Sequence, residues 1–438
     1  MSKKLILLVA FMSLALLGSS FAAVENIKVS GDIKSGAITR NLSLGSTTPD
    51  TKDQEDFLFS QIRLRFDADL TEGVSAVVGL INERIWGDNS YATTVGEDNA
   101  DDVDLNLAYI QLNEFMDQPL TVKIGRQNLY FGSGLIVGDP DTNRLVSDDS
   151  PTAIADQSLR KSFDALRATL DYAPYTIDMI YTKIEENETQ SRDDITLMGA
   201  NVAYDWASYN GLTEGYFFYQ QGTDSEQASD EDDDHIWVLG ARAQMDPNDN
   251  WTLGAEGAYQ GGEDQNSDTR KAWAAIVNAD YRFLNDYNAK LGFKYTYLSG
   301  DDDNDDDAEA WSPMSEDQTP AEIINILMSN SNAHYLTLTG SMMPREDITL
   351  SLLYTHAMLA EDYTDSTLDG AGVTNNAEYF VKTNEKHFGD EVDICALYDY
   401  TEDVQLKLTG AIFTPGEVFE DANDDTAYSL QAGINVDF

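Results

Sequence analysis

The feature that most constrains this chain is a long series of segments in which polar and apolar residues alternate. An alternation with a period of two predicts a β-strand with one polar and one apolar face. Strands of about nine to eleven residues are long enough to cross a bilayer. Eighteen such segments, each bounded by turn-forming residues, occur at 25–41, 56–70, 74–86, 103–114, 119–127, 162–172, 175–184, 195–206, 212–220, 235–245, 251–260, 271–283, 287–298, 333–343, 347–358, 387–400, 403–414 and 426–438.

The connections between these segments alternate strictly in length. Short turns, such as residues 71–73 and 247–249, follow the even-numbered segments, whereas long connections follow the odd-numbered ones, among them 128–161, 299–332 and 359–386. A transmembrane barrel separates its connections in this way, with tight turns on the periplasmic side and long external loops. The sequence therefore predicts an all-β fold, a transmembrane up-and-down antiparallel β-barrel of about 18 strands with short periplasmic turns and long acidic extracellular loops.

The amino terminus has the pattern of an export signal. Two lysines precede an apolar run that ends at Leu17, and small residues suggest cleavage after Ala22. We therefore predict a signal peptide at 1–22 and one barrel domain at 23–438, located in the outer membrane of a Gram-negative bacterium. No later apolar stretch approaches the length of a transmembrane helix. Cys395 is the single cysteine, which excludes an intramolecular disulfide.

Charge and the carboxyl terminus restrict the partners that we expect. The formal net charge is −51, which argues against nucleic acid as a partner because nucleic acid requires clustered Lys and Arg. The excess acid lies mostly between the predicted strands. The last segment ends on an aromatic residue, Phe438, a feature by which the barrel-assembly machinery recognises its substrates. We expect that machinery as a partner, and outer-membrane lipid and lipopolysaccharide around the apolar faces.

Charged side chains at alternating positions predict a polar wall inside the barrel. A barrel of this size leaves room for an aqueous channel, and charges on its wall would then set ion selectivity. The alternative is a lumen filled by ion-paired side chains that only hold the barrel together. We expect an anion-tolerant lumen lined by Arg63, Arg65, Arg167, Lys290 and Lys294, with Glu391 and Asp393 paired to these cations.

Three blocks of sequence resemble the alginate export family of outer-membrane porins. They are KIGRQNLYFGSGLIVGD at 123–139, SFDALRATL at 162–170 and KHFGDEVDICALYDYTEDVQLKLTGAIFTPG at 386–416. The resemblance implies an eighteen-stranded barrel that acts as a passive exporter or diffusion channel, with wall arginines that handle anionic sugars such as alginate-like polymers. The family's site residues carry over to Arg126, Gln127, Asp164, Arg167, Glu391 and Asp393.

Two features depart from this family pattern. A conductor of polyanions needs an electropositive pathway, whereas the predicted lumen is nearly balanced in charge and the external loops are strongly acidic. Strict alternation from Ile124 also places Arg126 on the lipid side. Either Gly125 forms a bulge that turns Arg126 inward, which we slightly favour, or Arg126 lies above the membrane and contacts a loop.

The long connections suggest further roles. Loop 128–161 either folds inward and narrows the pore or remains external. Residues 321–328 predict a short helix, which would form a lid over the mouth or rest on neighbouring loops. The acidic run at 301–307 favours a solvated, self-repelling loop. The alternatives are a diffuse atmosphere of divalent or other counter-ions and, more weakly, an ordered divalent-ion site. The carboxylates of that weaker hypothesis are Asp301, Asp303, Asp305 and Asp307.

Motifs for catalysis or cofactor binding are not found. The four histidines lie in or beside different strands, and no metalloprotease or Ser-hydrolase spacing occurs. We therefore expect a porin-like channel for polar or saccharide solutes, with no enzymatic activity and no cofactor. The alternative is a structural or interaction barrel with a plugged lumen, whose acidic loops bind divalent ions, envelope polysaccharide or a partner protein.

Overall fold

The computed structural model describes eleven parts of the chain, and the predicted signal peptide at 1–22 lies outside them. The described residues are 26–44, 54–87, 103–140, 157–185, 194–222, 234–263, 268–302, 307–362, 382, 384–421 and 423–438. Within this part of the chain, no helix has the length and apolarity needed to cross a membrane.

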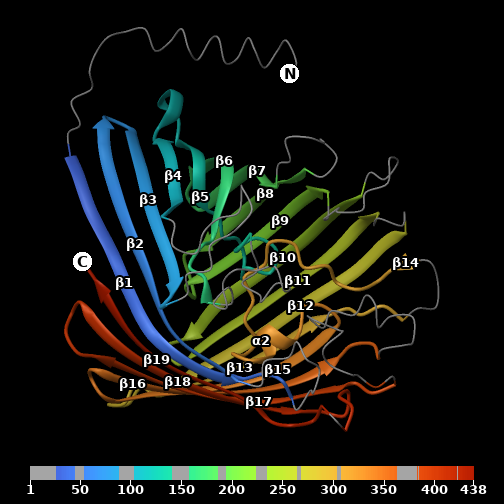
Figure 1. Ribbon diagram of the computed structural model, residues 1–438. Helices are drawn as coiled ribbons and strands as arrows, with labels where there is room; N and C mark the ends of the chain where they lie inside the picture. Colours follow the sequence, from blue (N-terminus) through green and yellow to red (C-terminus); the bar gives the residue numbers. More distant parts are fainter. Residues whose placement is uncertain are drawn as a thin grey trace.

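The long strands form one closed antiparallel barrel (Figure 1). Closure occurs where β1 pairs with both β2 and β19. The strands are β1 (Asn26–Asn41), β2 (Glu55–Thr71), β3 (Val74–Ile85), β4 (Asp104–Leu112), β5 (Leu120–Asn128), β6 (Ser162–Tyr172), β7 (Tyr175–Glu185), β8 (Ile195–Trp206), β9 (Gly211–Gln221), β10 (His235–Asn248), β11 (Trp251–Glu263), β12 (Thr269–Arg282), β13 (Lys290–Leu298), β14 (Asp307–Ala308), β15 (Ala333–Arg345), β16 (Ile348–Leu359), β17 (His387–Asp399), β18 (Val404–Pro415) and β19 (Ala427–Asp437).

The predicted fold class is confirmed, because each of the eighteen alternating segments corresponds to one long strand. Two details differ. β13 begins at Lys290 rather than at 287, because residues 283–289 form a turn in which the Phe283 N–H donates to the Ala289 carbonyl at 2.8 Å. The two-residue strand β14 was not predicted; it belongs to the long loop after β13 and pairs in parallel with β12.

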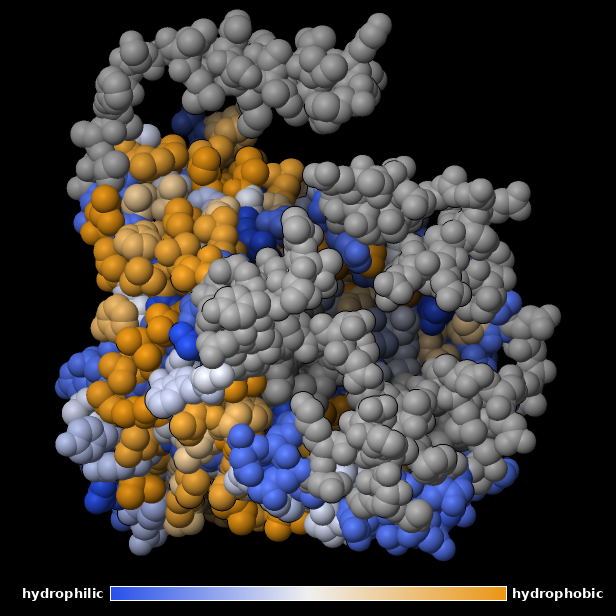
Figure 2. All heavy atoms as spheres, in the orientation of Figure 1, coloured by the Kyte–Doolittle hydropathy of each residue, from blue (hydrophilic) through white to orange (hydrophobic). Residues whose placement is uncertain are grey.

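The barrel has the two faces that the alternation predicts. Apolar side chains such as Leu352, Ile394 and Ile412 are at least half exposed on its outside, and hydrophobic residues cover much of the outer surface in Figure 2. Such a surface is unfavourable in water and favourable in lipid. The neighbouring positions along each strand, including Glu391 and Asp393, face the interior.

The carboxyl terminus completes the seam of the barrel. The Phe438 N–H donates to the Gly31 carbonyl and the Gly31 N–H donates to the Phe438 carbonyl, both at 2.9 Å. A Cβ at Gly31 would lie 2.9 Å from the Phe438 ring and 2.5 Å from the Arg63 carbonyl. The ring of Phe438 therefore packs at the seam only because position 31 carries no side chain.

Two long loops fold into the barrel and form a core with its wall. The first loop contributes Leu129, Phe131 and Leu135, and the second contributes Trp311, which is 1% exposed. The second loop also carries the predicted short helix, α2 (Ile324–Leu327), which lies within the barrel (Figure 1). The prediction that loop 128–161 folds inward therefore holds for residues 129–137, which belong to this core.

Candidate functional site

Several wall arginines form ion pairs across or along the strands. Arg63 Nε on β2 lies 2.8 Å from Asp32 Oδ1 on β1. Arg65 Nη2 lies 2.7 Å from Asp67 Oδ1 on the same strand. The side chains of Arg63 and Arg65 are nevertheless 42% and 43% exposed. Their charges are balanced, but their guanidinium groups remain open to solutes in the lumen.

Lys123 on β5 joins these arginines into one cationic surface. Its Nζ lies 4.6 Å from the centre of the Tyr109 ring, and the hydroxyl of Tyr109 lies 3.4 Å from Arg65 Nη2. Lys123 is also the cross-strand partner of Arg167, whose Nε bonds Asp178 Oδ1 at 2.8 Å.

Among the described residues no carboxylate forms a salt bridge with Lys123, whose ammonium instead lies over the Tyr109 ring. Our sequence analysis missed Lys123, although it opens the first family block and alternates with Val122 and Ile124. We name Arg63, Arg65, Lys123 and Arg167 the basic strip.

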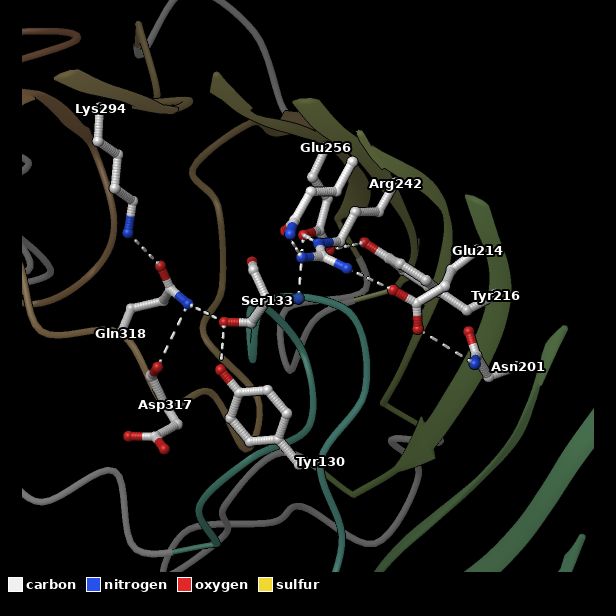
Figure 3. Close-up of polar contacts among 11 residues, drawn as sticks. Tyr130, Ser133, Asn201, Glu214, Tyr216, Arg242, Glu256, Lys294, Asp317 and Gln318 are labelled. Atoms are coloured by element: carbon white, nitrogen blue, oxygen red, sulfur yellow. Dashed lines mark hydrogen bonds and ion pairs between the residues drawn. The ribbon is translucent and has the colours of Figure 1, made fainter. Parts of the chain in front are cut away.

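The first inward loop is held by polar contacts around Ser133 (Figure 3). The Ser133 N–H donates to Glu256 Oε2 at 3.1 Å, and its carbonyl accepts from Gln318 Nε2 and from the Tyr130 hydroxyl, each at 2.7 Å. Partial burial raises the pKa of Tyr130 above its ordinary value, with a further contribution from the charge of Asp317. The hydroxyl therefore keeps the proton that it donates to the loop.

The wall behind this loop carries a buried polar network on β8 to β11 (Figure 3). Arg242 Nη1 donates to Glu214 Oε2 at 2.7 Å, and the Tyr216 hydroxyl donates to Glu256 Oε1 at 2.8 Å. Arg242 Nε also lies 3.9 Å from Glu256 Oε2. Because these charges and hydroxyls satisfy one another, Glu256 is fixed in place as an acceptor for the loop.

Glu391 and Asp393 hold the second inward loop. Glu391 Oε1 accepts the Ile323 N–H at 2.6 Å, and Oε2 accepts the Ile324 N–H at 2.7 Å. Asp393 Oδ2 accepts the Glu322 N–H at 3.2 Å. We expected these carboxylates to pair with wall cations. That expectation is wrong for the described residues. Their partners are backbone N–H groups at the start of α2, which have no acceptor within the helix. The sequence predicted a short helix in this loop but not its contact with these carboxylates.

The two loops are bonded to each other as well as to the wall. The Asp317 N–H donates to the Gly134 carbonyl at 2.8 Å, and Val137 pairs with Ser315 in a short parallel bridge. Lys161 Nζ lies 2.6 Å from Asp317 Oδ1. The loops therefore form one unit that narrows the lumen, rather than two independent flaps.

Glu83 on β3 anchors the returning end of the first loop. Its carboxylate accepts the Leu159 N–H and the Ser158 hydroxyl, both at 2.8 Å, and its Oε2 lies 3.4 Å from Arg160 Nε. The side chain is 7% exposed, as expected for a structural rather than a solute-binding group. Sequence reasoning did not identify Glu83, because its partners lie far away in the chain.

The two predicted lysines of β13 occupy different environments. Lys294 Nζ donates to Gln318 Oε1 of the second loop at 3.1 Å (Figure 3). A cavity of about 310 Å³ lies beside it, between residues 311–320 and the strands β12, β13 and β15. Lys290 is exposed near the periplasmic turn, opposite Arg282 on β12. Only Lys294 therefore lies against the loops.

The residues of the Gly-Arg-Gln block do not line the open lumen. The register runs through Gly125 on both neighbours without a shift, so the bulge that we slightly favoured is wrong. Arg126 remains on the outward face with Ile124, and its Nη1 lies 3.9 Å from Asp164 Oδ2, also on that face. Gln127 faces inward but is fully buried, and its amide donates to backbone carbonyls. Their placement in the solute pathway is thus not supported.

The described part of the acidic run makes protein contacts. Asp301 Oδ2 accepts the Glu309 N–H at 3.1 Å, and Asp307 pairs with Lys271. These contacts occupy two of the four carboxylates that we considered for a divalent ion. The other two, Asp303 and Asp305, lie outside the described residues.

The closed barrel with an apolar exterior and inward loops defines an outer-membrane protein of the porin type. The family model described as Alginate export matches residues 39–432, and the chain belongs to this family. Among curated proteins, no relative matches the sequence.

Among the solved structures with a similar fold are proteins of Pseudomonas aeruginosa, including the outer membrane protein OprD. OpdQ is 13% identical, with 96% of this chain and 99% of that chain covered and a TM-score of 0.58. OprD is 9% identical, with 96% of each chain covered and a TM-score of 0.57. OccK2 (OpdF) in complex with glucuronate is 12% identical, with 95% and 98% covered and a TM-score of 0.55.

Proposed function

We propose that this protein is a diffusion channel for small polar solutes, among them saccharides that carry a carboxylate. The observation that carries this proposal is the basic strip on β2, β5 and β6, whose arginine side chains remain accessible on the inner wall. Guanidinium and ammonium groups on a pore wall attract anionic groups and set selectivity. The aspartate partners of the arginines would weaken solute binding, which a conducting pathway requires.

The inward loops favour small solutes over polymers. They fold into the lumen, form a core with the wall and are bonded to it at Glu256 and Glu391. A polymer would have to displace this unit, whereas a monosaccharide needs only a gap at its edge. The complex of OccK2 (OpdF) with glucuronate supports a uronate as the solute class. Transport through such a channel is passive, so its direction follows the concentration gradient.

Bilayer electrophysiology with matched arginine variants tests the proposal. The wild-type channel should conduct, and the double variant Arg63→Gln, Arg65→Gln should shift the reversal potential in a salt gradient towards cations, because two accessible positive charges are lost. Arg126→Gln is the control, since Arg126 lies in the same wall of the barrel, on β5, but faces outward. An equal shift in both variants would contradict the role of the basic strip.

A plugged barrel is the second candidate, and one observation favours it. Phe131, Leu135, Trp311 and Ile324 form an apolar core between the loops and the wall, a feature that a water-filled pore does not need. In this case the protein would act through its surface, and its acidic loops would bind divalent ions, envelope polysaccharide or a partner protein. Absence of conductance at every voltage, from a preparation with correctly folded barrels, would favour this candidate.

A further inference from the structure

A histidine–carboxylate cluster lies outside the lumen, on the outer face of β16 and β17. His356 and Asp390 are direct cross-strand partners. His356 Nδ1 lies 2.8 Å from Asp390 Oδ1, and His387 Nε2 lies 3.0 Å from Asp390 Oδ2. Among the residues that the structure describes, this is the one group of three His, Cys, Asp or Glu side chains whose ligand atoms converge, all within 4.8 Å of one another.

A β-bulge brings His387 into this cluster. Ala357 pairs with Gly389 and Met358 pairs with His387, so β17 contains one extra residue, Phe388. The bulge turns Phe388 into the core, where it is fully buried, and places His387 beside Asp390 on the outer face. A Cβ at Gly389 would lie 2.5 Å from the Phe413 ring, so the bulge depends on glycine at this position.

The turn after β18 supplies a second carboxylate to His387. Glu417 Oε2 lies 2.5 Å from His387 Nδ1. Gly416 makes this approach possible, because its N–H donates to the Phe388 carbonyl at 2.8 Å and a Cβ there would lie 2.1 Å from the His387 carbonyl. Both ring nitrogens of His387 therefore face carboxylate oxygens.

We propose that His356, His387 and Asp390 form a binding site for a divalent transition-metal cation of the zinc type. Two imidazole nitrogens and one carboxylate oxygen suit zinc, whereas calcium and magnesium prefer ligand sets made of oxygen alone. Tetrahedral zinc with bonds of about 2.0–2.1 Å separates its ligands by about 3.3 Å. The separations of 2.8 and 3.0 Å end on the two oxygens of Asp390 and would have to widen to admit the ion, and all three ligand atoms already lie within 4.8 Å of one another.

The surroundings of the cluster fit a metal site. Glu417 would hold the Nδ1–H of His387 and leave Nε2 to bind the ion, and the Tyr354 hydroxyl donates to Asp390 Oδ1 at 2.6 Å. Such outer partners orient metal ligands and increase their basicity. Two carboxylates at this position also disfavour an anion, such as a lipid phosphate, as the ligand.

The site is reachable from solvent and joins three elements. The side chains of His356, His387 and Asp390 are about one-third exposed, at 32%, 30% and 33%. Val392, the next outward residue below Asp390, is lipid-facing and 40% exposed, which places the cluster near the extracellular edge of the apolar band. A bound ion would connect β16 and β17 directly, and through Glu417 the segment after β18.

Zinc binding to the purified barrel tests this proposal. The protein is produced without a polyhistidine tag, purified in detergent and freed of metal with a chelator. Zn²⁺ binding is then measured by isothermal titration calorimetry. A large excess of Mg²⁺ and Ca²⁺ is present to saturate the acidic loops. We expect about one Zn²⁺ per barrel in the wild type, and loss of that equivalent in His387→Ala and in Asp390→Asn. Glu417→Gln should weaken binding about tenfold, as expected for a lost outer partner.

His334→Ala is the matched control. His334 lies on the same outer surface, but its Nδ1 bonds the Tyr295 hydroxyl at 2.7 Å and it is not part of the cluster. This variant should bind Zn²⁺ as the wild type does. Heat-modifiable gel mobility checks that each variant is folded, and Asp390→Asn keeps the test valid if His387→Ala does not fold.

A second measurement reports the effect of the ion on the fold. A ligand that binds only the folded state stabilises that state. Zn²⁺ should therefore raise the Tm of the wild type and of His334→Ala, but not the Tm of Asp390→Asn. The proposal is overturned if the wild type binds no Zn²⁺ under these conditions, or if the cluster variants bind as much Zn²⁺ as His334→Ala.

Discussion

At the scale of single residues, a few side chains and glycines determine what the barrel presents on each face. Arg126 and Lys123 lie three positions apart on β5 and face opposite sides, so one pairs with Asp164 outside and the other extends the basic strip inside. Gly389 has a comparable effect on β17, because the bulge at this glycine moves His387 from the inner to the outer face. A side chain's position along the strand, or a single bulge, therefore decides whether it lines the lumen or lies on the outer face with the candidate metal site.

The glycine at the bulge gives a prediction at this scale. Gly389→Ala should lower the free energy of unfolding by about 1–3 kcal/mol, because the new methyl group would lie within 2.6 Å of both the Phe413 ring and the Thr414 carbonyl. Urea-induced unfolding of the barrel in lipid vesicles measures this change. Gly215→Ala is the control, since no heavy atom lies within 4 Å of its new Cβ. Equal stability of the two variants would contradict the packing argument.

At the scale of elements, the second inward loop depends on one buried carboxylate. Both oxygens of Glu391 accept backbone N–H groups at the start of α2, and the side chain is fully buried. The Thr355 hydroxyl adds a weaker contact to the Pro320 carbonyl at 2.9 Å. A four-residue helix is too short to be stable alone, so its position is set by the wall.

Removal of this anchor should release the loop. A buried donor left without its acceptor costs about 1–3 kcal/mol, and Glu391→Ala leaves two backbone N–H groups in this state. We expect a larger single-channel conductance and new protease cleavage within 299–332. Thr355→Val removes one hydrogen bond between neutral groups, so its conductance and its protease cleavage should remain near those of the wild type. Unchanged conductance and unchanged cleavage in Glu391→Ala would show that the loop is held elsewhere.

At the scale of the whole molecule, the ladder between β1 and β19 closes the barrel, and Phe438 lies at the end of this ladder. Phe438 pairs with Gly31 through two backbone hydrogen bonds, and its ring occupies the space above that glycine. The strand that closes the barrel therefore ends with the residue that we expect the assembly machinery to recognise. This recognition stays a prediction.

Truncation of the terminal ring tests its part in closure. Phe438→Ala keeps the backbone pairing but loses the ring at the seam, so barrels should assemble several-fold more slowly in cells. Pulse-chase labelling with heat-modifiable gel mobility follows the folded form. Phe283→Ala, which removes an exposed ring from the turn after β12, is the control. Assembly of Phe438→Ala at the wild-type rate would exclude a role for the ring.

The sequence by itself determined the barrel, its strands and its faces. A period of two follows from the covalent geometry of an extended chain, so the inward and outward positions of a regular strand can be counted along it. The long strands, to within a few residues, and the inward position of Arg63 and Arg65 were accessible in this way. The short helix predicted at 321–328, and found at 324–327, followed instead from the helical spacing of its apolar residues. Family motifs added the porin class, which the match to residues 39–432 confirms.

The tertiary structure decided which groups meet. Counting by twos from Glu391 places His387 in the lumen, and only the pairing of β16 with β17 reveals the extra residue that moves it outside. The partners of Glu391 were likewise visible only in the tertiary structure, because residues 323 and 324 are far away in the chain. Contacts between distant segments depend on how the loops fold against the wall, and alternation within one strand carries no information about that.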